Sequence, residues 1–588
     1  MGDRSLIGRN RRRHLFSLLP YLNRYRKRIL VGAVMVLLTN AAAVVSPWIL
    51  RQAIDELSLH LSRGRLTLFA ALIVAASLVE GIFRFLMRAV LIGVSRHIEY
   101  DLRNDLFAHL QRLSPAFYQR NPTGDLMARA TNDLSAVRSV LGPGIMYSIN
   151  TVFTTVLIVG ILVSIDARLA LLTLIPLLGV SLSVKYFGKR IHRRFQEIQA
   201  QFSELTTLVQ ENVAGVRVVK AYNQERAFVE RFQAYNSVYM RKSLALVRVW
   251  GMFNPLLTLL LGLSSVGLLW YGGRQVIQGA ISLGDFVAFI AYLAMLTWPT
   301  IALGWVINIF ERGSASMGRI NRILETQPEI VVAGGLSGER PEGDIEVKGL
   351  NFSYNGTPVL KNIRFRVRAG EMLAIVGRTG SGKSTLANLL CHHYVVPRAT
   401  LFIDGVDIND IPLARLRSRI GYVPQDTFLF SETIRQNLAF GRPEASLEEV
   451  IRASKLSQIW GDIQDFPDRF ETWVGERGIT LSGGQKQRIA IGRALLVNPP
   501  IMVLDDALSS VDTYTEERIL ARLAAERAHR TTILISHRIS TVKMADQILV
   551  LDEGKIRERG THDELLQAGG RYAELHKRQL LREELGIG

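Results

Sequence analysis

The stretch Leu373–Thr385, LAIVGRTGSGKST, decides the fold of the C-terminal half of this 588-residue chain. Its first four residues are apolar and predict a buried strand, a helix is expected from Thr385, and the residues between them match the pattern G-x-x-x-x-G-K-[ST]. Glycines allow backbone N–H groups to close around phosphate oxygens, and the helix N-terminus adds positive potential. The stretch therefore predicts a nucleotide site made of Gly377, Arg378, Thr379, Gly380, Ser381, Gly382, Lys383, Ser384 and Thr385.

Two side chains of this loop have distinct expected roles. Lys383 should hold the β- and γ-phosphates of ATP, and Ser384 should be a ligand of Mg²⁺. Further along, the apolar run Pro500–Leu504 predicts a second strand, which ends in Asp505 and Asp506. A carboxylate there, beside a phosphate loop, holds Mg²⁺, so Asp505 is expected to be a metal ligand. Without the phosphate loop, a helix N-cap would explain an Asp pair equally well.

A pentapeptide between these motifs, LSGGQ at Leu481–Gln485, is followed by a predicted helix. Together with the two motifs above, it closely resembles the signature of ATP-binding-cassette (ABC) proteins, and the resemblance extends over nearly the whole chain. It implies that two ATPase domains pair head to tail, with each ATP held between the phosphate loop of one and the signature of the other. The residues suited to meet a γ-phosphate at that helix N-terminus are Ser482, Gly483, Gly484 and Gln485.

The resemblance implies roles for three further residues. Tyr354 is similar to the aromatic residue that stacks on adenine, although a strand aromatic in the core is the simpler explanation. Gln425 resembles the glutamine that contacts Mg²⁺ and senses the membrane half. His537 resembles the switch histidine near the γ-phosphate. An isolated histidine after a strand is more often structural, but this one follows the Asp pair at the family's spacing.

Four loops also match the family pattern. Thr472–Gly478 resembles a loop of exporters that importers lack, and Ser509–Asp512 resembles the loop that connects the two ATP sites. The turns near Tyr118–Gly124 and Gly215–Asn223 match the two coupling helices that carry motion from the ATPase to the membrane half.

One residue departs from the family pattern. The resemblance implies a glutamate after the metal-binding aspartate, as the base that orients the attacking water, but this chain has Asp506. The shorter side chain withdraws the carboxylate by roughly 1.5 Å, and a misplacement near 1 Å can cost about a hundredfold in rate. We therefore expect this site to bind ATP and hydrolyse it poorly. The chain then resembles the MdlA-type subunit of bacterial heterodimeric multidrug exporters, with a homodimer of two slow sites as the alternative.

The N-terminal half contains six apolar segments long enough, or nearly so, to cross a membrane. The expected spans are residues 29–50, 66–86, 145–165, 169–189, 250–273 and 286–310. Glu80 and Arg84 interrupt the second span, which we accept because a charged side chain near a helix end can snorkel to the interface.

Positive charge predicts the orientation of these spans. Lys and Arg number 29 in residues 1–28, 84–143 and 185–249, against 5 in the opposite loops. The N-terminus and the two long loops should therefore face the cytoplasm, as should the ATPase half. The net charge of +19 lies mostly beside apolar segments, so it indicates membrane topology rather than binding of nucleic acid. No signal peptide is evident before residue 28, and we expect the N-terminus to be retained.

The predicted architecture follows from these parts. Residues 1–320 should form an all-α six-helix membrane domain of the type I ABC exporter, residues 321–342 a linker, and residues 343–588 an α/β P-loop ABC ATPase domain. Cys391 is the only cysteine, which excludes an intrachain disulfide. We interpret Cys391-His392-His393, expected on the helix after the phosphate loop, as structural rather than metal-binding.

The expected function is ATP-driven export of hydrophobic or amphiphilic substrates, drug-like or lipid-like, in a bacterial plasma (inner) membrane. The expected partners are a second half-transporter, the lipid bilayer and the substrate, with ATP and Mg²⁺ as cofactors and no nucleic acid. A non-transporting ABC ATPase that acts on nucleic acid or ribosomes disagrees with six spans. A third possible function, an ATP-gated channel or regulatory subunit, remains an alternative because of Asp506.

Overall fold

The computed structural model describes residues 14–57, 63–330, 342–475, 478, 480–525 and 530–584. Their backbone contacts form two compact units. The helical unit contains the described residues up to Arg112 together with Pro122–Thr326, and the α/β unit contains Leu113–Asn121 together with the described residues from Gln327 onward.

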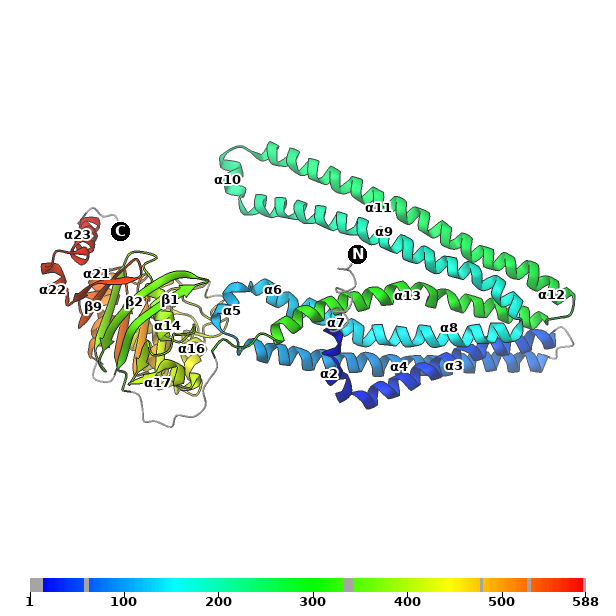
Figure 1. The fold of residues 1–588 in the computed structure, drawn as a ribbon, viewed down its shortest axis with the longest axis horizontal. Coiled ribbons are helices and arrows are strands. Elements are labelled where there is room, and N and C mark those ends of the chain that lie inside the picture. The colour runs from blue at the N-terminus through cyan, green and yellow to red at the C-terminus, as the bar shows by residue number, and fades with distance from the viewer. Residues whose placement is uncertain are drawn as a thin grey trace. The chain divides into compact units, whose positions relative to one another are not determined.

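Six helices in the described chain are long and apolar enough to cross a membrane (Figure 1). Large apolar side chains such as Phe85 and Val156 are 70% and 67% exposed, as expected of helices that face lipid. The main helices are α3 (Arg26–Leu57), α4 (Arg63–Leu110), α8 (Ile145–Ile165), α9 (Ala167–Ala214), α11 (Glu225–Gly267) and α13 (Leu283–Leu324).

Shorter elements connect the long helices or interrupt them. The π-helical turn Val140–Gly144 contains Pro143, which has no backbone N–H to donate to the preceding turn. The predicted span 250–273 is likewise not one regular helix, because a π-helical turn interrupts it at Leu268–Gly272. The short α-helices are α2 (Leu19–Arg24), α6 (Thr123–Ala128), α7 (Leu134–Ser139), α10 (Val216–Ala221) and α12 (Gly273–Ile277), and the other π turn is Arg129–Asp133.

Packing inside the helical unit separates a bundle from a hairpin. Helices α3, α4, α8 and α13 pack on one another, whereas α9 and α11 pack mainly on each other and are joined through α10 (Figure 1). Near the C-terminal end of α13, Arg319 donates to the buried Asp133, with 2.8 Å between Nε and Oδ2. Ser316 donates to the same carboxylate at 2.9 Å.

The α/β unit is built on two sheets (Figure 1). The smaller sheet is antiparallel, in the order β2-β1-β4-β5, and the larger has the order β10-β9-β3-β8-β7-β6, with only the β10–β9 pair antiparallel. The strands are β1 (Ile345–Tyr354), β2 (Thr357–Val367), β3 (Met372–Gly377), β4 (Leu401–Ile403), β5 (Val406–Asp407), β6 (Ile420–Val423), β7 (Ile501–Asp505), β8 (Thr531–Ile535), β9 (Gln547–Asp552) and β10 (Lys555–Gly560).

Helices cover the larger sheet on both faces, so its central strands β3, β7 and β8 are buried along their whole length. Alternate residues of β3 point to opposite faces: Leu373 and Ile375 join one apolar core, and Ala374 and Val376 the other. The helices are α14 (Lys383–Leu390), α15 (Leu413–Arg419), α16 (Ile434–Leu438), α17 (Leu447–Leu456), α18 (Trp460–Asp465), α19 (Gly483–Leu496), α20 (Thr513–Ala525), α21 (Ile539–Val542), α22 (His562–Gln567) and α23 (Arg571–Glu584).

Two boundaries differ in detail from the expected ones. Helix α13 continues to Leu324, into the predicted linker 321–342, and residues 331–341 of that linker lie outside the described residues. Cys391 is the residue that caps α14, so Cys391-His392-His393 follows the helix rather than lying on it. The Cys391 thiol is buried in the apolar core, and His393 Nδ1 lies 2.9 Å from Asn388 Oδ1.

Candidate functional site

One edge of the larger sheet gathers most of the predicted site residues. Strands β3, β8, β7 and β6 are parallel neighbours, so their carboxyl ends meet at the same edge. The phosphate loop follows β3, and His537 follows β8. Asp505 ends β7 and Asp506 follows it, and Gln425 follows β6. Ligands of open parallel sheets bind at this kind of edge.

The conformation of the phosphate loop requires glycine at two positions. Gly377 has φ +155°, and a Cβ there would lie 2.1 Å from the carbonyl oxygen of Leu551. Gly382, with φ +102°, precedes the first residue of α14, and a Cβ there would lie 2.7 Å from Leu360 Cδ2. The loop thus turns sharply against strand β9 and directs the N-terminus of α14 toward the edge of the sheet.

Lys383 and Ser384 lie at this edge with the carboxylates. The Lys383 ammonium donates to the carbonyl oxygens of Gly377 and Arg378, both at 2.9 Å. Burial lowers the pKa of Lys383, and the nearby Asp506 and Asp505 oppose that change. The Ser384 hydroxyl donates to Asp505 Oδ1 at 3.0 Å. Burial also raises the pKa of Asp505, which is 2% exposed.

These groups fit a triphosphate and a divalent cation. The Ser381 hydroxyl is buried and has no hydrogen-bond partner among the residues that the structure describes. Such an unsatisfied group in a glycine-rich loop is suited to donate to a phosphate oxygen. The hydroxyl of Ser384 and the carboxylate of Asp505 are hard oxygen ligands, of the type that Mg²⁺ prefers.

Asp506 and His537 lie beside this cluster. Asp506 adopts a left-handed backbone conformation, with φ +51°, and its N–H donates to the Ile535 carbonyl of β8 at 2.9 Å. Burial and the positive charge of Lys383 lower the pKa of His537, whereas Asp506 raises it. The structure therefore brings together five predicted residues: Lys383, Ser384, Asp505, Asp506 and His537.

The predicted signature forms the N-terminus of α19. Ser482 is its N-cap and makes a capping box with Gln485, whose backbone N–H donates to Ser482 Oγ at 3.3 Å. The Gln485 side chain donates to Asp462 at 2.9 Å. Among the described residues, the side-chain hydrogen bonds of Lys383 and Ser384 run to Gly377, Arg378 and Asp505, and none of these bonds involves the signature.

Two residues that the sequence analysis did not single out connect the signature to the other motifs. Gln487 of α19 donates to Ser509 Oγ at 2.9 Å and accepts from the Ser510 N–H at 2.8 Å. Arg538, next to His537, donates to the carbonyls of Val511 at 3.0 Å and Ser509 at 2.8 Å. The loop Ser509–Asp512 is thus held by both neighbours. No local pattern could have revealed this, because each pair is more than 20 residues apart in sequence.

The remaining predicted residues occupy less decisive positions. Tyr354 ends β1, is half-buried and makes edge contacts with Phe352 and Tyr394, at centroid distances of 4.9 and 5.2 Å. Gln425 is exposed after β6. Of the predicted exporter loop Thr472–Gly478, Glu476 and Arg477 lie outside the described residues.

One of the two predicted coupling turns is part of the α/β unit. Within Leu113–Asn121, α5 (Pro115–Arg120) places Ala116 in the apolar core of that unit, where it is 4% exposed. Ser114 and Arg120 each donate to Glu329 at 3.2 Å. The other turn, α10, connects α9 and α11 in the helical unit.

Comparisons with known proteins agree with this architecture. The family model of the ABC transporter transmembrane region matches residues 29–300, and the ABC transporter model matches residues 360–509. The chain is 38% identical to the probable multidrug resistance ABC transporter ATP-binding/permease protein YheI of Bacillus subtilis, covering 98% of this chain and 100% of that protein.

Another relative and a solved structure extend the similarity. The multidrug resistance-like ATP-binding protein MdlA of Escherichia coli is 36% identical, over 97% of this chain and 98% of its own. The structure of a bacterial Atm1-family ABC exporter with ATP bound matches with a TM-score of 0.78 and 30% identity, over 94% of this chain and 98% of that one.

Proposed function

The chain belongs to the ABC transporter family, with the transmembrane region and the ATPase domain in one polypeptide, and on that premise we propose that it is one half of a dimeric exporter of hydrophobic or amphiphilic compounds. It has the type I exporter fold, is an integral membrane protein, and couples hydrolysis of bound ATP to transport. One observation carries the proposal: a phosphate loop and two carboxylates at one sheet edge share a polypeptide with six membrane-length helices.

Each part of the site has a proposed task. Lys383 and the loop Gly377–Ser384 hold the phosphates of ATP, while Ser384, Asp505 and Gln425 hold Mg²⁺, which would draw charge from the γ-phosphate when bound. Tyr354 supports the adenine. His537 stabilises the negative charge that develops on the γ-phosphate. Its lowered pKa keeps the imidazole neutral, and the neutral ring can donate one hydrogen bond.

The signature is proposed to act on the second subunit. Ser482–Gln485 caps α19 and presents backbone N–H groups at a helix N-terminus, which favours contact with a phosphate. Such a contact joins two ATPase domains when ATP is bound, and the membrane helices linked to them then open the cavity to the other side. Hydrolysis and release reverse that change in an alternating two-state cycle.

We further propose that the site on this chain hydrolyses ATP weakly and that the favoured partner is a different half-transporter. The support is Asp506, whose carboxylate is one methylene shorter than that of glutamate and whose backbone is tied to Ile535 at 2.9 Å. The first alternative is a homodimer with two slow sites. The second alternative is an ATP-gated channel or regulatory subunit.

Substrate class and location rest on the relatives and on the charge pattern. The named relatives are described as multidrug resistance proteins, which supports export of drug-like or lipid-like amphiphiles. The excess of Lys and Arg, 29 against 5, supports a cytoplasmic N-terminus and ATPase domain in a bacterial inner membrane.

Transport and hydrolysis can be tested separately. Reconstituted into vesicles with its partner, the protein should move an amphiphilic dye in one direction when Mg²⁺ and ATP are added, and Lys383→Ala should abolish the flux by weakening nucleotide binding. Flux that follows the dye gradient in either direction would favour the channel instead.

The weak site is tested with the chain alone. Asp506→Glu should raise its ATPase rate by about tenfold to a hundredfold, whereas the matched variant Asp506→Asn should not raise it. Vigorous hydrolysis by the unmodified chain, unchanged by Asp506→Glu, would contradict both the weak site and the heterodimer.

A further inference from the structure

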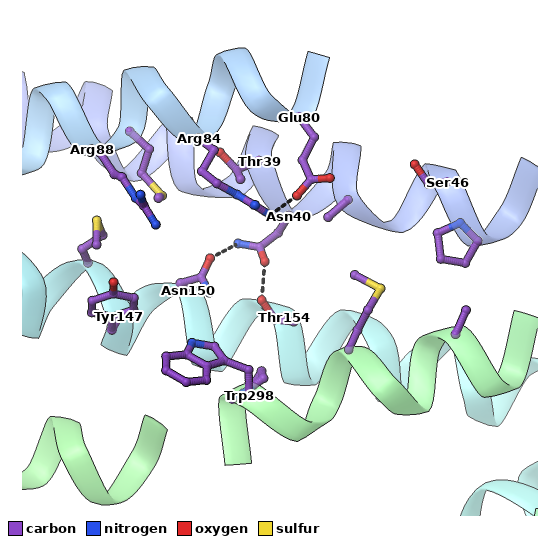
Figure 2. Close-up of a pocket in the computed structure, with 17 residues that line it drawn as sticks. Thr39, Asn40, Ser46, Glu80, Arg84, Arg88, Tyr147, Asn150, Thr154 and Trp298 are labelled. Atoms are coloured by element: carbon purple, nitrogen blue, oxygen red, sulfur yellow. Dashed lines mark hydrogen bonds and ion pairs between the residues drawn. The ribbon is translucent and has the colours of Figure 1, made fainter. Parts of the chain in front are cut away.

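Helices α3, α4, α8 and α13 of the helical unit enclose a cavity of about 530 Å³ (Figure 2). This volume lies in the range of small-molecule sites, roughly 300–1,000 Å³. Its lining combines charged, amide and apolar side chains.

The charged side chains are three residues of α4, spaced four apart: Glu80, Arg84 and Arg88. This spacing puts them on one face of the helix. Glu80 is paired with Arg84, whereas Arg88 is exposed and makes no hydrogen bond or ion pair in the described part of the chain. Two guanidinium groups against one carboxylate leave one positive charge, and it resides on Arg88.

The position of these charges along α4 places them near one membrane boundary. Counted from Leu66, where the apolar run begins, Arg88 lies roughly 33 Å along the helix and Glu80 roughly 21 Å, against a hydrocarbon thickness of about 30 Å. In the proposed orientation Arg88 therefore reaches the headgroups of the cytoplasmic leaflet. Glu80 lies within the hydrocarbon thickness, and a charged side chain at that depth that lines a cavity indicates a functional site.

Deeper in the cavity, amide and hydroxyl groups bond to one another across helices. Asn40 of α3 donates to Asn150 of α8 at 3.1 Å and accepts from Thr154 (Figure 2). Asn40 also donates to the Val36 carbonyl at 2.8 Å. Amide and hydroxyl groups are uncharged, so the cluster brings no net charge. Its hydrogen bonds join α3 to α8 beside the cavity.

The apolar lining comes from all of the helices. It includes Met87, Met146, Met295, Tyr147 and Trp298, and Trp298 is 59% exposed. Methionine side chains are flexible and polarisable, so they can adapt to acyl chains or rings of different shape. The cavity therefore presents the Arg88 cation and an adaptable apolar surface together, with Tyr147 across from Arg88 (Figure 2).

We propose that this cavity binds amphiphiles with an anionic headgroup, a phosphate or carboxylate that pairs with Arg88 while the tail lies against the methionines and Trp298. The inference rests on the proposed function, because it names the substrate class of that exporter. A cationic amphiphile would need the Glu80 carboxylate, which Arg84 already neutralises. A phosphate or carboxylate matches the planar fork of a guanidinium with two parallel hydrogen bonds.

The test uses the full-length chain with its partner in nanodiscs of zwitterionic lipid. The probes are a dodecyl phosphate with a brominated tail and a dodecyl trimethylammonium with the same tail, and binding is read from quenching of tryptophan fluorescence. The phosphate should bind more tightly than the ammonium. Trp298→Phe should remove a large part of the quenching, which assigns the signal to this cavity.

Four variants of two arginines locate the interaction. Arg88→Gln should weaken binding of the phosphate probe by about tenfold to a hundredfold. Arg88→Lys should weaken it less, because the charge is kept while the planar fork is lost, and Arg88→Glu should reverse the preference toward the ammonium. Arg248→Gln is the matched control: Arg248 is an exposed arginine near the expected cytoplasmic end of the span 250–273 and outside the cavity, so this variant should leave both affinities unchanged.

Equal binding of the two probes, or a phosphate affinity that Arg88→Gln leaves unchanged, would overturn the proposal. ATP-driven dye flux with that result would leave the exporter function standing, so the two failures are distinguishable. Two sources could supply such a headgroup. Displacement of the probe by phosphatidic acid in the nanodisc would identify a membrane lipid, and displacement only by single-chain alkyl phosphates would identify a free amphiphile.

Discussion

At the scale of single residues, the signature glycines are required by contacts inside this chain. A Cβ at Gly484 would lie 2.8 Å from the carbonyl oxygen of Ser510, and one at Gly483 would lie 3.3 Å from Ser510 Cβ. Both glycines therefore let α19 approach the loop Ser509–Asp512, which Gln487 also binds. The small size of these glycines therefore has two roles: it permits close packing, and it leaves backbone N–H groups accessible to a phosphate.

Gly484→Ala should consequently separate α19 from that loop and lower the ATPase rate of the assembled transporter by about tenfold or more, since small misplacements are costly at a catalytic site. Gly461→Ala is the matched control, because Gly461 is also helical and a Cβ there meets nothing within 4 Å. Steady-state hydrolysis with Mg²⁺ and ATP measures both variants. A Gly484→Ala rate equal to that of the control would show that the close approach has no functional role.

At the scale of elements, the short helix α5 is part of the α/β unit although its neighbours in sequence are part of the helical unit. Ala116 enters the apolar core, and Glu329 accepts from Ser114 and Arg120. Tyr394 joins the same core and makes an edge contact with Tyr354 at a centroid distance of 5.2 Å. The proposed adenine-stacking residue and the proposed coupling helix therefore pack against one apolar core.

Ala116→Asp should release α5, because burial of an unpaired charge costs about 3–5 kcal/mol. The expected result is ATP hydrolysis that persists but no longer responds to amphiphiles, together with loss of vectorial flux. Ala234→Asp places the same charge on an exposed alanine of α11 and should change neither activity. Substrate-stimulated ATPase and dye flux in vesicles are the measurements. Stimulation retained in Ala116→Asp would assign coupling to other contacts.

At the scale of the whole molecule, we propose that one chain supplies half of each of two different ATP sites. Its phosphate loop and carboxylates converge at one sheet edge, whereas Gln485 of its signature donates to Asp462, and Gln487, just after the signature, donates to Ser509. Family membership implies that a second ATPase domain completes each site. The predicted weakness of the Asp506 site then makes the identity of that partner the main determinant of turnover.

Disulfide crosslinking can reveal the partner, because Cys391 is the only cysteine and is buried. In a Cys391→Ser background, Ser381→Cys should crosslink to a cysteine placed in the signature of the partner subunit when ATP is bound and hydrolysis is blocked. The same chain carrying Ser482→Cys should not replace that partner. Efficient ATP-dependent crosslinking between two copies of this chain would establish the homodimer instead.

Local motifs determined much of this protein from sequence alone. The phosphate loop, the Asp pair and LSGGQ are contiguous patterns, and their chemistry follows from residue types that stay adjacent in any fold. The apolar spans could also be predicted, because a membrane requires long uncharged helices. Each predicted segment lies within one of the long helical stretches. The π turn within 250–273 was missed, since hydropathy does not encode a local change of hydrogen bonding.

Tertiary structure alone decided which distant residues meet. Gln487 and Arg538 hold the loop Ser509–Asp512, and Leu113–Asn121 joins the α/β unit. Arg88, which pairs with no residue that the structure describes, lines a cavity together with Asn40. These contacts join segments that are from about 20 to more than 200 residues apart. The physical reason is that a side chain's partner depends on the packing of whole helices and strands, which no short stretch of sequence contains.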